Sequence, residues 1–168
     1  YLSSSARGIH SIAMNHPIFG YGSLVHPDTR SEAPKAQPAI LRWWRRSWAH
    51  RERVGGKPTS VLTVRMAPGS EILGVVLSVP DAYFPTLEKR ETGYQLAPVL
   101  PFAVRTKQEL PCETYVGDPA RRKPPEREAP IWRSYLNCVL AGFYRLGGDE
   151  ALDDFVYSTD DWGPILDD

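Results

Sequence analysis

The sequence predicts an α+β domain built on a mixed, partly closed β-sheet. Three observations support this: strand-like apolar runs dominate the first half, one helical segment follows residue 80, and helical composition returns near the end. The chain has 168 residues, of which 42% are hydrophobic and 24% charged. These values are typical of a globular protein with one packed core.

The first half of the chain is rich in Val, Ile, Leu and Trp between turn signals. Gly55-Gly56 and Pro68-Gly69 are the turn signals that divide its later part. Short spacing across these turns favours antiparallel pairing. The predicted strands cover residues 17–22, 39–50, 60–67 and 71–79, with a proline-containing loop over 27–38.

The second half begins with a predicted helix over residues 81–92, which Asp81 caps and Gly93 closes. Pro98 and Pro101 favour an edge strand or an irregular one after it. The remaining predicted elements are extended segments over 94–104 and 112–116, a loop over 118–130, and helices over 131–146 and 150–159.

Composition also bears on domain limits and location. Residues 1–13 are rich in Ser and non-periodic, which favours an expression leader or a disordered N-terminus before a single domain over 14–168. No apolar run approaches the roughly 18 residues of a membrane span, and two cysteines are too few for a disulfide framework. We therefore expect a cytoplasmic protein with no membrane partner. The sequence carries no signal for an oligomeric state.

A glycine-containing loop over residues 20–24 follows the first predicted strand, with the sequence Gly-Tyr-Gly-Ser-Leu. The dinucleotide fingerprint, the serine nucleophile elbow and the phosphate-binding loop all require residues that are absent here. Glycines after a strand allow successive N–H groups to face one concavity, which suits a carboxylate or an oxyanion. The alternative is a plain turn.

Glu91 lies on the apolar face of the predicted helix over 81–92. At about 100° per residue, Glu91 falls about 35° from the centre of the face defined by Tyr83, Phe84 and Leu87, whereas Glu88 falls about 95° away. Burial and the negative end of the helix dipole both raise the pKa of an inward carboxyl, which suits a general base. The alternative is a structural ion pair with an arginine such as Arg90 or Arg105.

Other unusual residues have simpler interpretations. The segment 42–48, Arg-Trp-Trp-Arg-Arg-Ser-Trp, could stack on single-stranded nucleic acid, but 20 basic and 20 acidic residues balance, so a sheet segment with solvated arginines is favoured. The four histidines have no metal-ligand spacing, and neither cysteine has a local partner that marks a nucleophile. We expect no metal site, and we interpret the Asp pairs at 153–154 and 160–161 as solvated helix ends.

Three motifs together resemble the gamma-glutamylcyclotransferase-like superfamily, in order and in spacing. They are Phe-Gly-Tyr-Gly-Ser-Leu at 19–24, Leu-Glu-Lys-Arg-Glu-Thr-Gly-Tyr at 87–94 and Ser-Tyr-Leu at 134–136. The end of the chain, over 134–144 and 158–162, resembles a bacterial branch of that family. Glu88 stands where relatives often have Asp. The likeness runs from about residue 18 to residue 168, although a tail found in similar proteins is not matched.

The resemblance implies a small mixed, barrel-like sheet flanked by helices, and a reaction. The α-amino group of a γ-glutamyl substrate attacks its own γ-carbonyl, which gives 5-oxoproline and a released amine or amino acid without a cofactor. Glu91 is then the catalytic acid and base, and the loop residues Tyr21, Gly22, Ser23 and Leu24 bind the substrate, with Tyr135 orienting it. Two alternatives remain: a noncatalytic binder of γ-glutamyl-like ligands and a nucleic-acid-binding module.

Overall fold

A long antiparallel hairpin forms the centre of the structure, a computed structural model that describes residues 15–30 and 36–168. Strand β2 (Ala36–Val54) pairs with β3 (Lys57–Pro80) along most of its length. The tip is Gly55-Gly56, where φ is 58° and 80°. Positive φ at both central residues is the requirement of the tight hairpin turn that suits twisted strands. The antiparallel pairing and this turn are therefore confirmed.

The predicted turn at Pro68-Gly69 is wrong, because β3 continues through it. The register shifts here, with Arg42 opposite Glu71 and Trp44 opposite Met66, so one residue of β2 faces four of β3. A bulge of this kind accommodates a proline, which lacks an N–H for the ladder, and a glycine with φ of 84°. The two strands predicted over 60–67 and 71–79 are thus one bent strand.

The other strands extend the hairpin into one mixed sheet. Strand β1 (Asn15–Gly20) runs antiparallel to β3 and parallel to β6 (Cys112–Gly117). Strand β4 (Tyr94–Val99) is the edge strand that Pro98 predicts, beside β6. Strands β5 (Phe102–Ala103) and β8 (Thr159–Asp160) both pair with β2. The order is β4-β6-β1-β3-β2-β5, with β8 off this path, so the described pairings leave the sheet open. The α+β class with a mixed sheet flanked by helices is confirmed.

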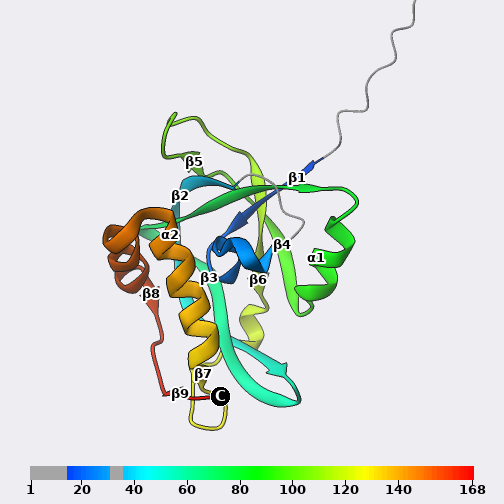
Figure 1. Cartoon of the computed structure of the whole chain (residues 1–168), viewed down its shortest axis with the longest axis vertical. Coiled ribbons are helices and arrows are strands. Elements are labelled where there is room, and N and C mark those ends of the chain that lie inside the picture. Colours follow the sequence, from blue (N-terminus) through cyan, green and yellow to red (C-terminus); the bar gives the residue numbers. More distant parts are fainter. Residues whose placement is uncertain (1–14, 31–35) are drawn as a thin grey trace, which may run out of the picture.

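Two helices flank this sheet (Figure 1). Helix α1 (Phe84–Arg90) is shorter than predicted, and its N-cap is Tyr83. Asp81 does not cap it, because its carboxylate binds His16 at 2.7 Å. Helix α2 (Arg133–Tyr157) packs on β3 and joins the two predicted helices across a break at Gly147 and Gly148. The break occurs at glycines because Gly148 has φ of 64°.

Shorter elements complete the described chain. The 3-10 turns are η1 (Ser23–Val25), η2 (Pro27–Thr29) and η3 (Pro119–Arg121), and β7 (Ile131–Trp132) pairs in parallel with β9 (Ile165–Leu166). The proposed boundary at Met14 lies outside the described residues. In residues 15–30 and 36–168, no helix combines the length and apolarity needed to cross a membrane.

Candidate active site

The glycine loop connects β1 to η1 and lies beside α2 (Figure 1). Strand β1 ends at Gly20, and the chain turns back through two short bonds: Val25 N–H donates to the Gly22 carbonyl and His26 N–H to the Ser23 carbonyl, both at 3.0 Å. In the described part of the chain, the N–H groups of Gly22, Ser23 and Leu24 donate to no protein acceptor. These three donors are therefore available to a ligand, as the nest interpretation requires.

The limited space around Gly22, rather than its backbone angle φ, favours a glycine at this position. Its φ is −137°, so it does not adopt the left-handed conformation that favours glycine. A Cβ atom here would lie 3.1 Å from Leu62 Cδ1 and 3.7 Å from the Tyr135 hydroxyl. Leu62 is 1% exposed and has little room to withdraw. Any larger residue would therefore crowd the space between β3 and α2.

Tyr21 is buried and faces away from solvent. Its hydroxyl donates to the Tyr115 carbonyl at 2.5 Å, and its own carbonyl accepts from Arg46 Nε at 2.7 Å. Burial, with the negative charge of Glu91 second, holds the pKa of Tyr21 well above its usual range. The side chain of Tyr21 thus fixes the loop to β6, and its backbone is fixed to β2.

Glu91 caps the C-terminal end of α1, one residue beyond the last helical residue. Its N–H donates to the Leu87 carbonyl at 2.9 Å, and its carbonyl accepts from Tyr94 N–H in the turn that follows. The side chain is 15% exposed, whereas Glu88 is exposed. The helical-face argument therefore gives the correct direction for both. Burial raises the pKa of the Glu91 carboxyl, and the charge of Arg90 partly opposes this.

Arg90 connects the glutamate to the glycine loop. Its Nε lies 3.7 Å from Glu91 Oε1, and its guanidinium donates to the Thr29 carbonyl and, at 3.2 Å, to Ser23 Oγ. The ion pair that was the structural alternative for Glu91 is therefore present, with Arg90 rather than Arg105. It does not remove Glu91 from the cavity, so the structure contains both features.

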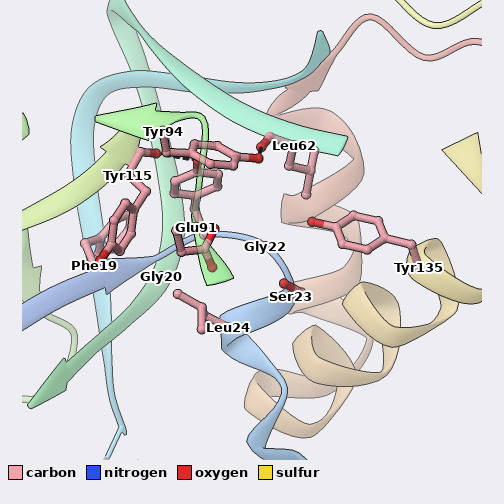
Figure 2. A pocket seen from close by; sticks show the side chains of 11 residues that line it. Phe19, Gly20, Gly22, Ser23, Leu24, Leu62, Glu91, Tyr94, Tyr115 and Tyr135 are labelled. Carbon is pink, nitrogen blue, oxygen red and sulfur yellow. Dashed lines mark hydrogen bonds between the residues drawn. The ribbon is translucent and has the colours of Figure 1, made fainter. Parts of the chain in front are cut away.

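The loop, Glu91 and Tyr135 line one small, partly open cavity. Figure 2 shows Glu91 beside the loop backbone and Tyr135 pointing from α2 toward Gly22 and Ser23. Burial holds the pKa of Tyr135 above its usual range, so its hydroxyl stays protonated. The full lining is Phe19, Gly20, Tyr21, Gly22, Ser23, Leu24, Leu62, Glu91, Tyr94, Tyr115 and Tyr135. All six residues predicted for the site are thus brought together.

Two tyrosines of this cavity are absent from the sequence prediction. Tyr94 donates to the Leu62 carbonyl at 2.7 Å. Tyr115 is 5% exposed, and its hydroxyl has no partner among the described residues. A buried hydroxyl without a partner is costly, so this hydroxyl is able to donate to a water or a ligand in the cavity. Tyr94 closes the Glu-Thr-Gly-Tyr motif and could have been found there, whereas Tyr115 has no signal of its own.

Glu52 is a second carboxyl that the sequence analysis missed. It lies on β2, 28% exposed, in a neighbouring cavity that Arg53, Arg90 and Thr92 also line. Burial and, second, the negative charge of Glu91 raise its pKa to about 7, while Arg90 opposes the shift. The charge of Glu91 therefore acts on a second carboxyl in the adjoining cavity, and Arg90 acts on both.

The segment 42–48 is largely structural, but its arginines are not all solvated as expected. Arg46 and Trp48 are 0% exposed, and Arg45 binds Asp160 at 2.7 Å. The interpretation of Asp160 as solvated is therefore wrong. Trp43 is 62% exposed, on a bulge with φ of 69°. The burial of Arg46 and Trp48 does not support a platform for stacking bases.

The site has the groups needed for acid–base and oxyanion chemistry. A carboxyl with a raised pKa, three available backbone donors and protonated phenols surround one small space. Within the described ranges, no group of three or more His, Cys, Asp or Glu side chains is placed to hold a metal ion.

Solved structures similar to this one share its fold. A gamma-glutamyl cyclotransferase superposes with a TM-score of 0.71 at 17% identity, covering 90% of this chain and 94% of that one. An uncharacterized protein from Homo sapiens gives 0.70 at 19% identity, covering 91% and 94%. A yeast gamma-glutamyl cyclotransferase described as specific to glutathione gives 0.64 at 16% identity, covering 87% and 97%.

Sequence comparison gives the family. A comparison with curated proteins finds no match. Residues 17–128, more than half of the chain, match the family described as ChaC-like protein. This match gives the family, and the related structures share its fold. The chain belongs to the ChaC-like family, within the gamma-glutamylcyclotransferase-like superfamily.

Proposed function

We propose that this protein cyclises a γ-glutamyl compound to 5-oxoproline and releases the amine or amino acid that was attached. The observation that carries the proposal is the shared cavity: buried Glu91 lines the same space as Gly22, Ser23 and Leu24, whose N–H groups have no acceptor among the described residues. A proton acceptor and anion donors at one place are what an intramolecular acyl transfer needs.

The reaction begins with the substrate folded so that its α-nitrogen faces its own γ-carbonyl carbon. The α-amino group reacts as the neutral amine: Glu91 takes one proton from its nitrogen as this forms the new C–N bond, and the carbonyl oxygen becomes an oxyanion. Loop N–H groups bind this oxyanion or the α-carboxylate. The bond to the leaving nitrogen then breaks as Glu91 returns its proton to that nitrogen. Because both reacting groups belong to one molecule, the reaction needs no cofactor.

The tyrosines give the cavity its shape and its neutral donors. Tyr135, with its raised pKa, donates rather than accepts at neutral pH and lies beside Gly22. The Tyr115 hydroxyl, which has no partner among the described residues, is a further donor for the substrate. We assign orientation of the γ-glutamyl group to these two side chains.

Cys112 and Cys138 are free thiols, consistent with a cytoplasmic protein.

Mass spectrometry of 5-oxoproline across a panel of γ-glutamyl compounds tests this function. The panel contains glutathione, γ-glutamyl amino acids and γ-glutamyl amines, and we expect release from at least one class. Binding of a panel member without 5-oxoproline would instead support the noncatalytic binder. Salt-dependent binding of a single-stranded oligonucleotide, without turnover or binding of any panel member, would support the nucleic-acid-binding alternative.

A further inference from the structure

Arg46 is a buried cation directly behind the glycine loop. The side chain extends from β2 and is 0% exposed. Its Nε donates to the Tyr21 carbonyl at 2.7 Å, one Nη to Ser158 Oγ at 2.6 Å and the other Nη to the Leu73 carbonyl. Each of these acceptors belongs to a different part of the fold: the loop, the end of α2 and β3. The guanidinium therefore joins three segments that are distant in sequence.

The surroundings of Arg46 are costly for a charge. All three acceptors are neutral oxygens, and only the ring faces of Phe143 and Phe155, 4.8 and 5.0 Å from its Cζ, add a favourable cation–π contribution. Burial lowers its pKa to about 9, and the negative charge of Asp154 partly opposes this. Neutral acceptors and aromatic faces offset the cost of burying a charge only in part, so a buried arginine is weak evidence for stability. Its three hydrogen bonds are the specific feature of this position.

The bond to Tyr21 gives Arg46 a specific effect on the site. A trans peptide is planar, with its C=O and N–H on opposite sides. Fixing the Tyr21 carbonyl toward Arg46 therefore fixes the N–H of Gly22 in the direction away from Arg46. Gly22 and the next residue, Ser23, line the candidate cavity, and their N–H groups are among the available donors. The orientation of the Gly22 N–H thus depends on a side chain that does not line the cavity.

The end of α2 holds Arg46 in place. Ser158 Oγ accepts from Arg46 and donates to the Asp154 carbonyl at 2.5 Å, while the Ser158 carbonyl accepts from Arg46 N–H at 3.2 Å. Asp154 also accepts from Leu73 N–H through its carboxylate at 3.2 Å, so it is not the solvated residue that the sequence suggested. The C-terminal motif that starts at Ser158 therefore has a structural connection to the glycine loop.

We propose that Arg46 is a positioning residue, which orients the Tyr21–Gly22 peptide and couples the glycine loop to the C-terminal end of α2 through Ser158. This inference rests on the proposed function, because the oriented N–H groups are those assigned to substrate binding. Arg46 does not touch the substrate. It acts by keeping the donors of the loop in one orientation before the substrate arrives.

Arg46→Lys is the direct test, because lysine keeps the charge but has no planar fork that reaches all three acceptors. Arg45→Lys is the matched control, since the neighbouring Arg45 binds Asp160 and the Tyr157 carbonyl instead. We expect Arg46→Lys to reduce kcat/KM by about 10-fold to 100-fold, mainly through KM, and the control by less than about twofold. Amide hydrogen exchange should accelerate at residues 22–24 and stay unchanged in the first turns of α2.

Ser158→Ala keeps the test decisive if Arg46→Lys does not fold. This variant leaves every cavity-lining residue in place and removes one acceptor of the guanidinium, so we expect exchange at residues 22–24 to rise about threefold. Two results would overturn the proposal. The variants that fold could keep wild-type exchange and kinetics, or exchange could rise as much in the first turns of α2 as at residues 22–24. Hydrogen exchange needs no substrate. If the wild type released no 5-oxoproline, the proposed function would be refuted, but the exchange measurement would still decide the role of Arg46.

Discussion

Replacing Arg90 by methionine should raise the pKa of Glu91 and move the acid limb of kcat/KM to higher pH. The guanidinium Nε lies 3.7 Å from Glu91 Oε1. At that separation, Coulomb's law gives about 4 kcal/mol at an effective dielectric constant of about 20 and about 1 kcal/mol in water. Arg90 is 35% exposed and Glu91 15%, so solvent screens the pair and the lower end of this range applies.

A loss of about 1.4 kcal/mol of attraction between a cation and a carboxylate raises the pKa of the carboxyl by one unit. The sign follows from the charges: the cation favours the ionised carboxylate, so its removal favours the protonated form and activity appears only at higher pH. We therefore expect the acid limb to move upward by about one unit in Arg90→Met. The assay is 5-oxoproline release as a function of pH at substrate concentrations well below KM.

Two comparisons separate charge from anchoring. Arg90 also binds the Thr29 carbonyl and Ser23 Oγ, so its loss could loosen the loop without any electrostatic effect. Arg90→Lys keeps the charge and weakens these contacts, so its acid limb should stay near that of the wild type although kcat/KM falls. Lys89→Met removes an exposed neighbouring charge and should change neither. An acid limb that stays in place in Arg90→Met, or moves to lower pH, would refute the assignment of Glu91 as the titrating base.

Three further outcomes follow from the same site. Glu52→Gln should remove an ionisation near pH 7 from the kcat/KM profile, since the pKa of Glu52 is raised to about 7; its persistence would assign that step to another group. Gly22→Val should lower kcat/KM by more than about 100-fold, because its side chain enters the space beside Leu62 and Tyr135, whereas Ser23→Ala should cost less than about tenfold. Comparable losses in steady-state kinetics would contradict backbone binding. Glu91→Gln should be more stable than the wild type in denaturant at pH 8 but not at pH 4. The pKa of Glu91 is raised in the folded state, so the wild type loses stability as the pH rises from about 4.5 through the folded-state pKa. An equal difference at both pH values would exclude burial of a titrating carboxyl.

Local patterns predict the parts of the fold that depend on neighbouring residues. The direction of Glu91 follows from helical periodicity, and the hairpin tip follows from Gly55-Gly56. Errors arise where a distant partner decides the outcome. Asp81 could cap a helix, but His16 binds its carboxylate, and Pro68-Gly69 forms a bulge because β2 continues opposite it.

The site shows the same division. The residues predicted for it belong to three motifs, and those motifs are short enough to be seen in the sequence. Tyr115 and Glu52 belong to strands whose sequences carry no such pattern. Only the packing of β6 brings Tyr115 into the cavity, and only that of β2 brings Glu52 into the neighbouring one. Arg46 is a similar case, because no local pattern distinguishes a buried arginine from its neighbour Arg45.

The account depends most on Glu91 as the proton carrier, and turnover of Glu91→Gln tests this directly. The amide keeps the shape of the side chain but cannot take up the proton, and loss of a general base costs about 10² to 10⁴ in rate. Glu88→Gln is the matched control, because Glu88 is exposed on the same helix. With the best substrate of the panel, we predict that 5-oxoproline release falls by that factor in Glu91→Gln, with substrate binding retained, and stays within about twofold in Glu88→Gln. Near wild-type release by Glu91→Gln would contradict the mechanism.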